Sequence, residues 1–165
     1  MTLDLLADGQ KVFIDANVFI YHFSGVSPAC SRFLTRCEAG ALDGVTSVQV
    51  VLEVLHRLMM LDAVMKGLVS PGGVAAKLKR RPELIRELYG YAAYALRIPE
   101  MGVRVLPSNM DDCRRSQRVR DEYGLMTNDS MVLAAMETAG CINLASADAD
   151  FDRVSGITVY KPGDV

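Results

Sequence analysis

The amino-acid sequence predicts an α/β fold in which helices cover a parallel β-sheet. Five short runs of strand-favouring residues recur along the chain, and longer helical patterns separate them. This alternation is typical of parallel strands that are joined by helical crossovers. The chain has 165 residues, half of them apolar, and is therefore large enough to bury about 70% of its extended surface as one domain.

The predicted strands are short and rich in Val and Ile, which favour the pleated, half-buried surface of a sheet. The first strand, KVFI, is followed directly by a carboxylate. The five strands are expected at residues 11–14, 44–47, 102–106, 141–145 and 157–160.

The segments between the strands have the length and spacing of helices. The only break that is rich in Pro and Gly is SPGG at residues 70–73, which we interpret as a loop inside a single domain of residues 1–165. Repeats and low-complexity tracts are absent. The expected helices cover residues 28–39, 48–66, 74–78 or beyond, 82–97, 110–123 and 129–139.

Composition excludes several classes of protein. The four cysteines show no CxxC pair and no paired His spacing, so reduced and mostly buried thiols in a cytoplasmic protein are expected. The start of the chain lacks the pattern of a secretory signal, and no apolar run is long enough to span a bilayer. The net charge of −2 argues against a polyanion-binding surface over the whole molecule, although basic residues gather in two segments, 77–86 and 113–120.

Four acids are predicted to meet at one edge of the sheet, because reactive groups in an open parallel sheet gather outside the carboxyl ends of the strands. Asp15 closes the first strand, and Asp148 follows the fourth. Asp129 begins a helix that leads back into the fourth strand, so that helix must start at the same edge. Glu53 lies in the second turn of the helix that leaves the second strand.

Each acid also has a purely structural interpretation. Asp15 and Asp129 occupy positions from which they can cap helices, and Asp148 can form an Asx-turn. Glu53 lies on a mostly polar helical face and can pair with Arg57 at i,i+4. The conjunction of the four acids, more than any one of them, favours a functional site.

A cluster of carboxylates requires a cation, since two of them about 4 Å apart repel by roughly 4 kcal/mol at an effective dielectric near 20. Ligand sets made only of oxygen favour Mg²⁺ or Mn²⁺. Such a site suits metal-assisted attack of water on a phosphodiester, which needs no nucleophilic side chain. The only histidines, His22 and His56, are interpreted as surface or core residues.

Four ordered motifs resemble the PIN domain, and especially its bacterial and archaeal VapC-type members. They are FIDANVFIY, TSVQVVLEVL, YGLMTNDSMVLAAM and LASADADF, with ITVYKP near the end of the chain, so the resemblance covers nearly all of it. The resemblance implies a three-layer α/β/α sandwich with a central parallel sheet. It also implies a Mg²⁺- or Mn²⁺-dependent endoribonuclease.

The resemblance assigns roles to individual residues. The catalytic and metal-binding acids would be Asp15, Glu53, Asp129 and Asp148, with Asn17 and Ser47 in supporting positions. The chain departs from the common Thr-x-Asp pattern at residues 146–148, where Ser146 keeps the hydroxyl. Asp150 and Asp152 follow closely, so either can assist or replace Asp148. The segment of about residues 62–99 is longer than small family members need, which predicts a helical elaboration.

The resemblance further implies an RNA substrate, a homodimer and, for a toxin, a cognate antitoxin. Arg114, Arg115 and Arg118 fall on one side of a helix that we expect to start near the carboxyl edge, where they can hold phosphates. The alternative is a solvated helix face. The run KLKRR, residues 77–81, is either an RNA or partner contact or a solvated helix end.

Two other functions remain open from the sequence. One is a catalytically silent PIN-like module that binds RNA or protein, although such a module does not need four acids at one edge. The other is a phosphatase that forms an aspartyl-phosphate at the end of a strand. That chemistry calls for a second aspartate two residues after the nucleophile, but position 17 is Asn.

Overall fold

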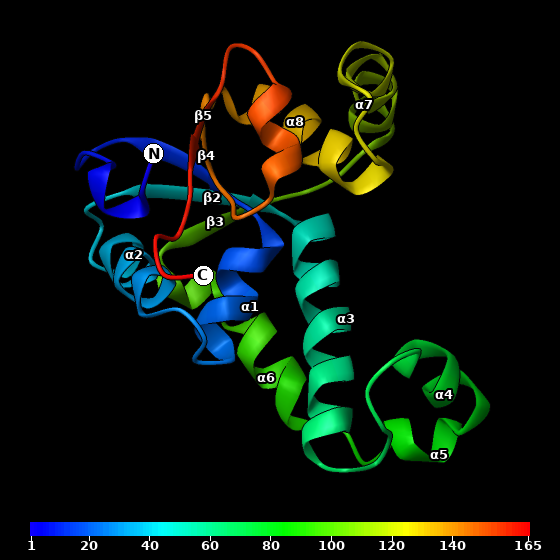
Figure 1. The fold of residues 1–165 in the computed structure, drawn as a ribbon. Helices are drawn as coiled ribbons and strands as arrows, with labels where there is room; N and C mark the ends of the chain where they lie inside the picture. Colours follow the sequence, from blue (N-terminus) through cyan, green and yellow to red (C-terminus); the bar gives the residue numbers. More distant parts are fainter.

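Five parallel strands form one sheet with helices on both faces, as predicted (Figure 1). The computed structural model describes all 165 residues. The strand order is β3-β2-β1-β4-β5, so the first strand of the chain lies at the centre. The strands are β1 (Lys11–Ile14), β2 (Asp43–Ser47), β3 (Val103–Leu106), β4 (Asn143–Ala145) and β5 (Thr158–Tyr160), each within two residues of its predicted bounds.

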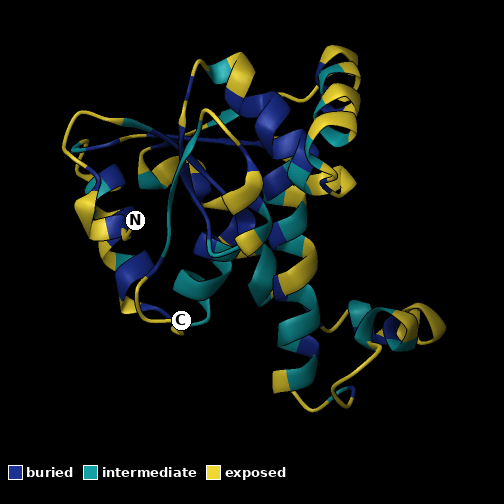
Figure 2. Cartoon of the chain, turned by 45° about the horizontal axis from the view of Figure 1, so that its top comes forward, coloured by how far each residue is buried: buried dark blue, intermediate teal, exposed yellow.

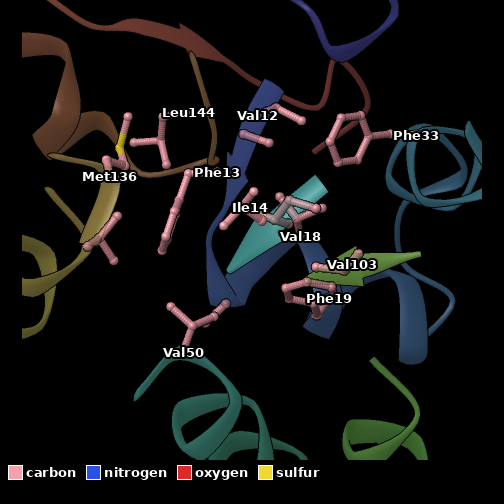
Figure 3. Packing of buried hydrophobic residues seen from close by; sticks show 14 of the residues in the cluster. Val12, Phe13, Ile14, Val18, Phe19, Phe33, Val50, Val103, Met136 and Leu144 are labelled. Carbon is pink, nitrogen blue, oxygen red and sulfur yellow. The ribbon is translucent and has the colours of Figure 1, made fainter. Parts of the chain in front are cut away.

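The central strand is buried on both faces, which explains its unbroken apolar sequence. Phe13 pairs in register with Val45 of β2 and with Leu144 of β4. Its ring points toward Met136 on one side of the sheet, whereas Val12 on the other side points toward the ring of Phe33 (Figure 3). Val12, Phe13 and Ile14 are fully buried, and each such side chain contributes roughly 1.5–3 kcal/mol.

Eight α-helices surround the sheet. In the view of Figure 1, α7 and α8 lie above the sheet, and α1, α2 and α6 lie below it. The helices are α1 (Ala16–Phe23), α2 (Pro28–Glu38), α3 (Val48–Met65), α4 (Val74–Arg80), α5 (Pro82–Ile85), α6 (Gly90–Leu96), α7 (Met110–Tyr123) and α8 (Thr127–Ala139).

Two helix expectations differ from the structure. Helix α1 is absent from the predicted set because its sequence, ANVFIYHF, is rich in strand formers. The expected helix over residues 82–97 is broken into α5 and α6. Leu84 and Leu88 pack into a small cluster near the end of α3, whereas Ala95 packs into the main core. One straight helix cannot deliver these residues to two separate clusters, so the chain turns between them.

The segment after α3 builds a second, smaller apolar cluster, made by Ala63, Val69, Leu78, Leu84 and Leu88. We refer to residues 66–89, which contain α4 and α5, as the helical arm. The arm projects from the end of α3 away from the sheet (Figure 1), and most of its surface is exposed (Figure 2). The predicted elaboration, residues 62–99, thus contains the arm, the end of α3 and α6.

The structure agrees with the prediction of mostly buried thiols. Cys30, Cys37 and Cys141 are buried, Cys113 is exposed, and all four are free thiols. No helix combines the length and the apolar composition that crossing a bilayer requires.

Replacing Gly102 with Ala is expected to lower the free energy of unfolding by about 3 kcal/mol or more. Gly102 has φ +70°, and an added Cβ would lie 2.4 Å from the carbonyl oxygen of Cys37, so the backbone must move. Urea unfolding measures the change. Gly140→Ala is the matched control, because Gly140 has φ +59° but open space around it, and about 1 kcal/mol is expected there. Equal losses would show that the close approach at Gly102 is unimportant.

Candidate active site

A cleft of about 270 Å³ opens at the carboxyl edge of the sheet, and all four predicted acids line it. Asp15 comes from the end of β1, Glu53 from α3, Asp129 from the first turn of α8, and Asp148 from the loop after β4. Helix α8 returns to the opposite edge, where the Nζ of Lys11, at the start of β1, donates to the carbonyl oxygen of Ala139 at 3.0 Å. The structure therefore brings together acids that are scattered over more than 130 residues of the chain.

Asp15 is the most deeply buried of the four cleft acids, with only 9% of its surface exposed. It is the N-cap of α1, and its Oδ1 accepts from the backbone N–H of Ala16 at 2.7 Å. Its Oδ2 accepts from the Nδ2 of Asn17 at 2.6 Å and from the Oγ of Ser146 at 2.7 Å. Burial raises the pKa of Asp15 to about 6, and the charges of Glu53 and Asp129 add to the rise against the lowering effect of the hydrogen bonds.

Asn17 and Ser146 join the ends of β1 and β4. The Oδ1 of Asn17 accepts from the backbone N–H of Ala147 at 3.0 Å, while its Nδ2 also donates to the Oγ of Ser146 at 3.1 Å. The Oγ of Ser146 in turn accepts from the backbone N–H of Asp148 at 3.0 Å. This network fixes the orientation of the Asp15 carboxylate relative to the loop that carries Asp148.

A second group of acids lies beside this network. The carboxylate oxygens of Asp129, Asp148 and Asp150 lie within 4.8 Å of one another. Burial, followed by the charges of Asp148, Asp150 and Glu53, raises the pKa of Asp129. Asp150 forms an ion pair with Arg153, and of the three late acids, Asp148, Asp150 and Asp152, only Asp148 lines the cleft. Asp152, the other late acid, pairs instead with Lys161 at 2.5 Å, outside the cleft.

The structure shows which of the acids cap helices or form turns, as their structural interpretations predicted, and which do not. Asp15 caps α1, and Asp148 accepts from the backbone N–H of Asp150 at 2.8 Å in the expected Asx-type turn. Both residues still face the cleft, so capping and clustering coexist. The N-cap interpretation of Asp129 is wrong. Helix α8 begins at Thr127, with Met126 as N-cap, so Asp129 is the third residue of the helix.

Glu53 is held by an amide and not by its helical neighbour. The Nδ2 of Asn128 donates to the Oε2 of Glu53 at 3.3 Å, and the Nε2 of Gln49 donates to the Oδ1 of Asn128 at 3.2 Å. Arg57 lines the cleft but forms no ion pair with Glu53, so the expected i,i+4 pair is absent. Sequence reasoning missed Asn128 and Gln49. Their signal was the position of Asn128 beside Asp129 and of Gln49 one turn before Glu53.

Ser47 does not reach the cleft. It is buried at the end of β2, where it caps α3 by accepting from the backbone N–H of Val50 at 3.4 Å. It supports the site by fixing the start of the helix that carries Glu53.

The basic residues of α7 lie elsewhere than expected. Arg115 pairs with buried Asp112 and also donates to Thr138, in the last turn of α8, at 2.7 Å. The first turns of α7 therefore lie toward the amino edge of the sheet, and the expectation that this helix starts near the carboxyl edge is wrong. Helix α7 packs antiparallel to α8, since Arg115 contacts the last turn of α8 whereas Arg120 contacts Ser130 near its start.

The antiparallel packing of α7 on α8 decides how near each arginine of α7 lies to the cleft acids. Arg114 pairs with Asp111 at 2.5 Å, and Arg118 is exposed. Arg120 lies nearer the acids, since it donates to the Oγ of Ser130, next to Asp129, at 2.9 Å. The cation that lines the cleft itself is Arg57, on α3.

The donor set fits a hard divalent cation. Every cleft acid offers oxygen, and burial, together with the charges of neighbouring carboxylates, raises the pKa of both Asp15 and Asp129. Mg²⁺ and Mn²⁺ prefer such oxygen ligands and lower the cost of crowding them. Asp129, Asp148 and Asp150 present carboxylate oxygens close enough together to share an ion, and Asp15 and Glu53 line the same cleft as Asp129 and Asp148.

The chain is similar to known proteins over most of its length. The PIN domain family matches residues 12–157. Ribonuclease VapC2 of Methanocaldococcus jannaschii is 22% identical over 157 residues, which are 95% of this chain and 97% of that protein.

Two solved structures share the fold. VapBC2 from Rickettsia felis, bound to a DNA fragment from its promoter, gives a TM-score of 0.58 at 10% identity, covering 92% of this chain and 98% of that one. VapC20 from Mycobacterium tuberculosis, described as a toxin that cleaves the sarcin–ricin loop, gives 0.56 at 17% identity, covering 86% and 92%.

Proposed function

This chain belongs to the PIN domain family, and on that premise we propose that it is a Mg²⁺- or Mn²⁺-dependent endoribonuclease that hydrolyses RNA phosphodiester bonds. The observation that carries the proposal is the meeting of Asp15, Glu53, Asp129 and Asp148 in one cleft. A similar protein of M. jannaschii is named a ribonuclease, and the M. tuberculosis relative is described as an RNA-cleaving toxin. We further propose that the chain acts in the cytoplasm as the toxin of a toxin–antitoxin pair.

The residues of the cleft would have different roles in this reaction. When bound, the divalent ion would supply a water of lowered pKa and neutralise charge on the leaving oxygen. Asn17 and Ser146 hold the Asp15 carboxylate in one orientation, so that it does not have to reorganise when a ligand arrives. Arg57 places a positive charge in the cleft, where it attracts a phosphate that the acids would otherwise repel.

Cleavage of a mixed RNA pool tests the proposal. Fragments are expected with Mg²⁺ or Mn²⁺ and not with EDTA, because the acids alone cannot activate water. RNA binding without any cleavage under all three conditions would favour the catalytically silent PIN-like module instead.

A cognate antitoxin and a second copy of the chain are the proposed protein partners. Related structures include a toxin–antitoxin complex from Klebsiella pneumoniae. An apolar hollow of about 260 Å³ lies between α3, α6 and the edge strand β3, and its rim includes Leu52 and Leu96, which are 59% and 63% exposed. Exposed apolar surface of this kind supports a protein interface.

Replacing Leu52 and Leu96 together with Asp is expected to convert a dimer into a monomer. Charges on this apolar face would be buried without partners, which costs several kcal/mol per ion. Light scattering over a range of concentrations measures the mass. Met65→Asp, on an exposed residue of the same helix outside the hollow, is the control and should leave the mass unchanged. A parent protein that is monomeric at all concentrations would contradict the dimer.

A further inference from the structure

The proposed catalytic site leaves one of the two basic segments of the chain, residues 77–86, without a role. Residues 77–86 contain five basic residues and one acid, in a chain whose net charge is −2. They form α4 and α5 of the helical arm, which projects from the end of α3 (Figure 1). Positive charge gathered on one projecting element of an acidic protein is a local surface for a polyanion.

The arm presents these charges in an open arrangement. Arg80 and Arg81 line a hollow of about 260 Å³ together with Ser70 and Lys77. The Nζ of Lys77 donates to the carbonyl oxygen and the Oγ of Ser70 at 2.9 and 2.8 Å, which fixes the wall of the hollow. Arg80 and Arg86 are exposed and form no ion pair, so their donors are free for phosphate oxygens.

Aromatic side chains line a hollow where the arm joins α3 and α6. A hollow of about 410 Å³ is lined by Phe23, Tyr89, Tyr91 and Tyr94 together with apolar residues of α3. Tyr89 is 78% exposed, and the Nζ of Lys66 lies 4.5 Å from the centre of its ring. An exposed ring beside a cation is a surface on which an unpaired base can stack.

The acidic cleft and the aromatic hollow follow one another along α3, and the basic hollow comes just after the end of that helix. Glu53 and Arg57 line the first, Leu61 and Met65 the second, and the residues just after α3 line the third. Helix α1 also lines both of the first two. Lys66 lies 13 residues after Glu53, which is about 20 Å at 1.5 Å per residue. A strand of several nucleotides is needed to reach from one to the other.

We propose that the basic residues of the helical arm and Tyr89, its last residue, form a second contact region for single-stranded RNA, which holds the substrate several nucleotides from the scissile bond. The proposal rests on the ribonuclease function proposed above. Arg80 and Arg86 contact phosphates, and Tyr89 stacks on a base. Unpaired RNA is the form favoured, because stacking on a side chain requires a base that is free of its own helix.

Binding without divalent ions tests the contact separately from cleavage. The probe is a labelled single-stranded RNA of about 20 nucleotides in EDTA. The double variant Arg80→Gln/Arg86→Gln is expected to bind about tenfold more weakly, and the slope of log affinity against log salt should fall by about 1.4, or about 0.7 per lost phosphate contact. The matched control is Arg32→Gln/Arg104→Gln, which removes two exposed arginines of α2 and β3 and should change neither quantity.

Tyr89 gives an independent measurement. Tyr89→Ala is expected to weaken binding of the same RNA about tenfold with an unchanged salt slope, because stacking releases no counterion. Tyr89→Phe keeps the ring and should restore parent affinity. Equal losses in both variants, or a changed slope, would show that the ring does not stack on RNA.

A short RNA separates this proposal from the ribonuclease function. An oligonucleotide of about four nucleotides fills the cleft without reaching the arm, so the arginine variant should cleave it as the parent does and should lose efficiency only on the long RNA. If the parent cleaves nothing but the arm variants still weaken RNA binding, the ribonuclease function fails and the contact stands. Unchanged binding in the arm variants overturns the contact, as does a changed mass in sedimentation with unchanged RNA affinity, which would assign the arm to a protein partner.

Discussion

Replacing Asp15 with Asn is expected to reduce RNA cleavage by about a thousandfold or more. The substitution keeps the size of the side chain but removes the negative charge that would hold the divalent ion at the centre of the cleft. Asp15 is also the acid that Asn17 and Ser146 orient, so no neighbouring carboxylate can take its place without moving. The measurement is kcat/KM on a single-stranded RNA in saturating Mg²⁺.

Two further variants make this result specific. Asp129→Asn should cause a comparable loss, because Asp129 lies in the same cleft. Asp152→Asn should retain parent activity, since Asp152 pairs with Lys161 and does not line the cleft. Cleavage that survives both Asp15→Asn and a chelator would reject the metal-dependent mechanism.

Without divalent ions, the protein is expected to lose stability as the pH rises from about 4 to about 6. The pKa of Asp15 is raised from 3.8 to about 6 in the folded protein, chiefly by burial, so the folded state binds this proton more tightly than the unfolded state. The stability is complete below the lower value and is lost as the pH rises through the higher one. A difference of about two pKa units corresponds to roughly 3 kcal/mol. The raised pKa of Asp129 acts in the same direction. Urea unfolding in EDTA across this pH range measures the loss.

Mg²⁺ is expected to restore this stability near pH 7 and to have little effect near pH 4, because it binds deprotonated carboxylates. Asp129→Asn should be more stable than the parent in EDTA near pH 7, since it removes one of the repelling charges, and it should respond weakly to Mg²⁺. Asp121→Asn, at an exposed acid of α7, is the control and should behave as the parent does. A parent protein that gains no stability from Mg²⁺ or Mn²⁺ near pH 7 would show that the cleft is not a metal site.

Much of the site was accessible from the sequence because it depends on position along strands. The carboxyl ends of parallel strands lie at one edge of a sheet, so an acid at the end of β1 and another after β4 must be neighbours. The same rule placed Glu53 and Asp129, since each lies near the start of a helix at that edge. The supporting amides, Asn128 and Gln49, were not predicted, because their only signal is their position near Asp129 and Glu53, and an amide on a solvated helix face can have the same position.

The direction of α7 was predicted wrongly from the sequence. Its bounds, Met110–Tyr123, were predicted correctly, yet its first turns lie toward the amino edge of the sheet. Helical spacing reports which residues share a face but not how three loop residues redirect the chain. The hydrogen bonds of Asp112 and Arg115 with Thr138 of α8 fix that direction, and the spacing of charges along α7 does not reveal them.

The sequence by itself determined the α/β class, the five strands, the acids that converge and the oxygen chemistry of their cleft, because each follows from local periodicity and from the polarity of a parallel sheet. Only the tertiary structure decided which arginine faces the cleft, which of the late aspartates lines it, and where the helix expected over residues 82–97 breaks. It also placed an aromatic hollow along α3 between the acidic cleft and the hollow lined by basic residues of the arm. Such outcomes depend on packing between segments far apart in the chain, and that packing leaves no periodic signal in either segment alone.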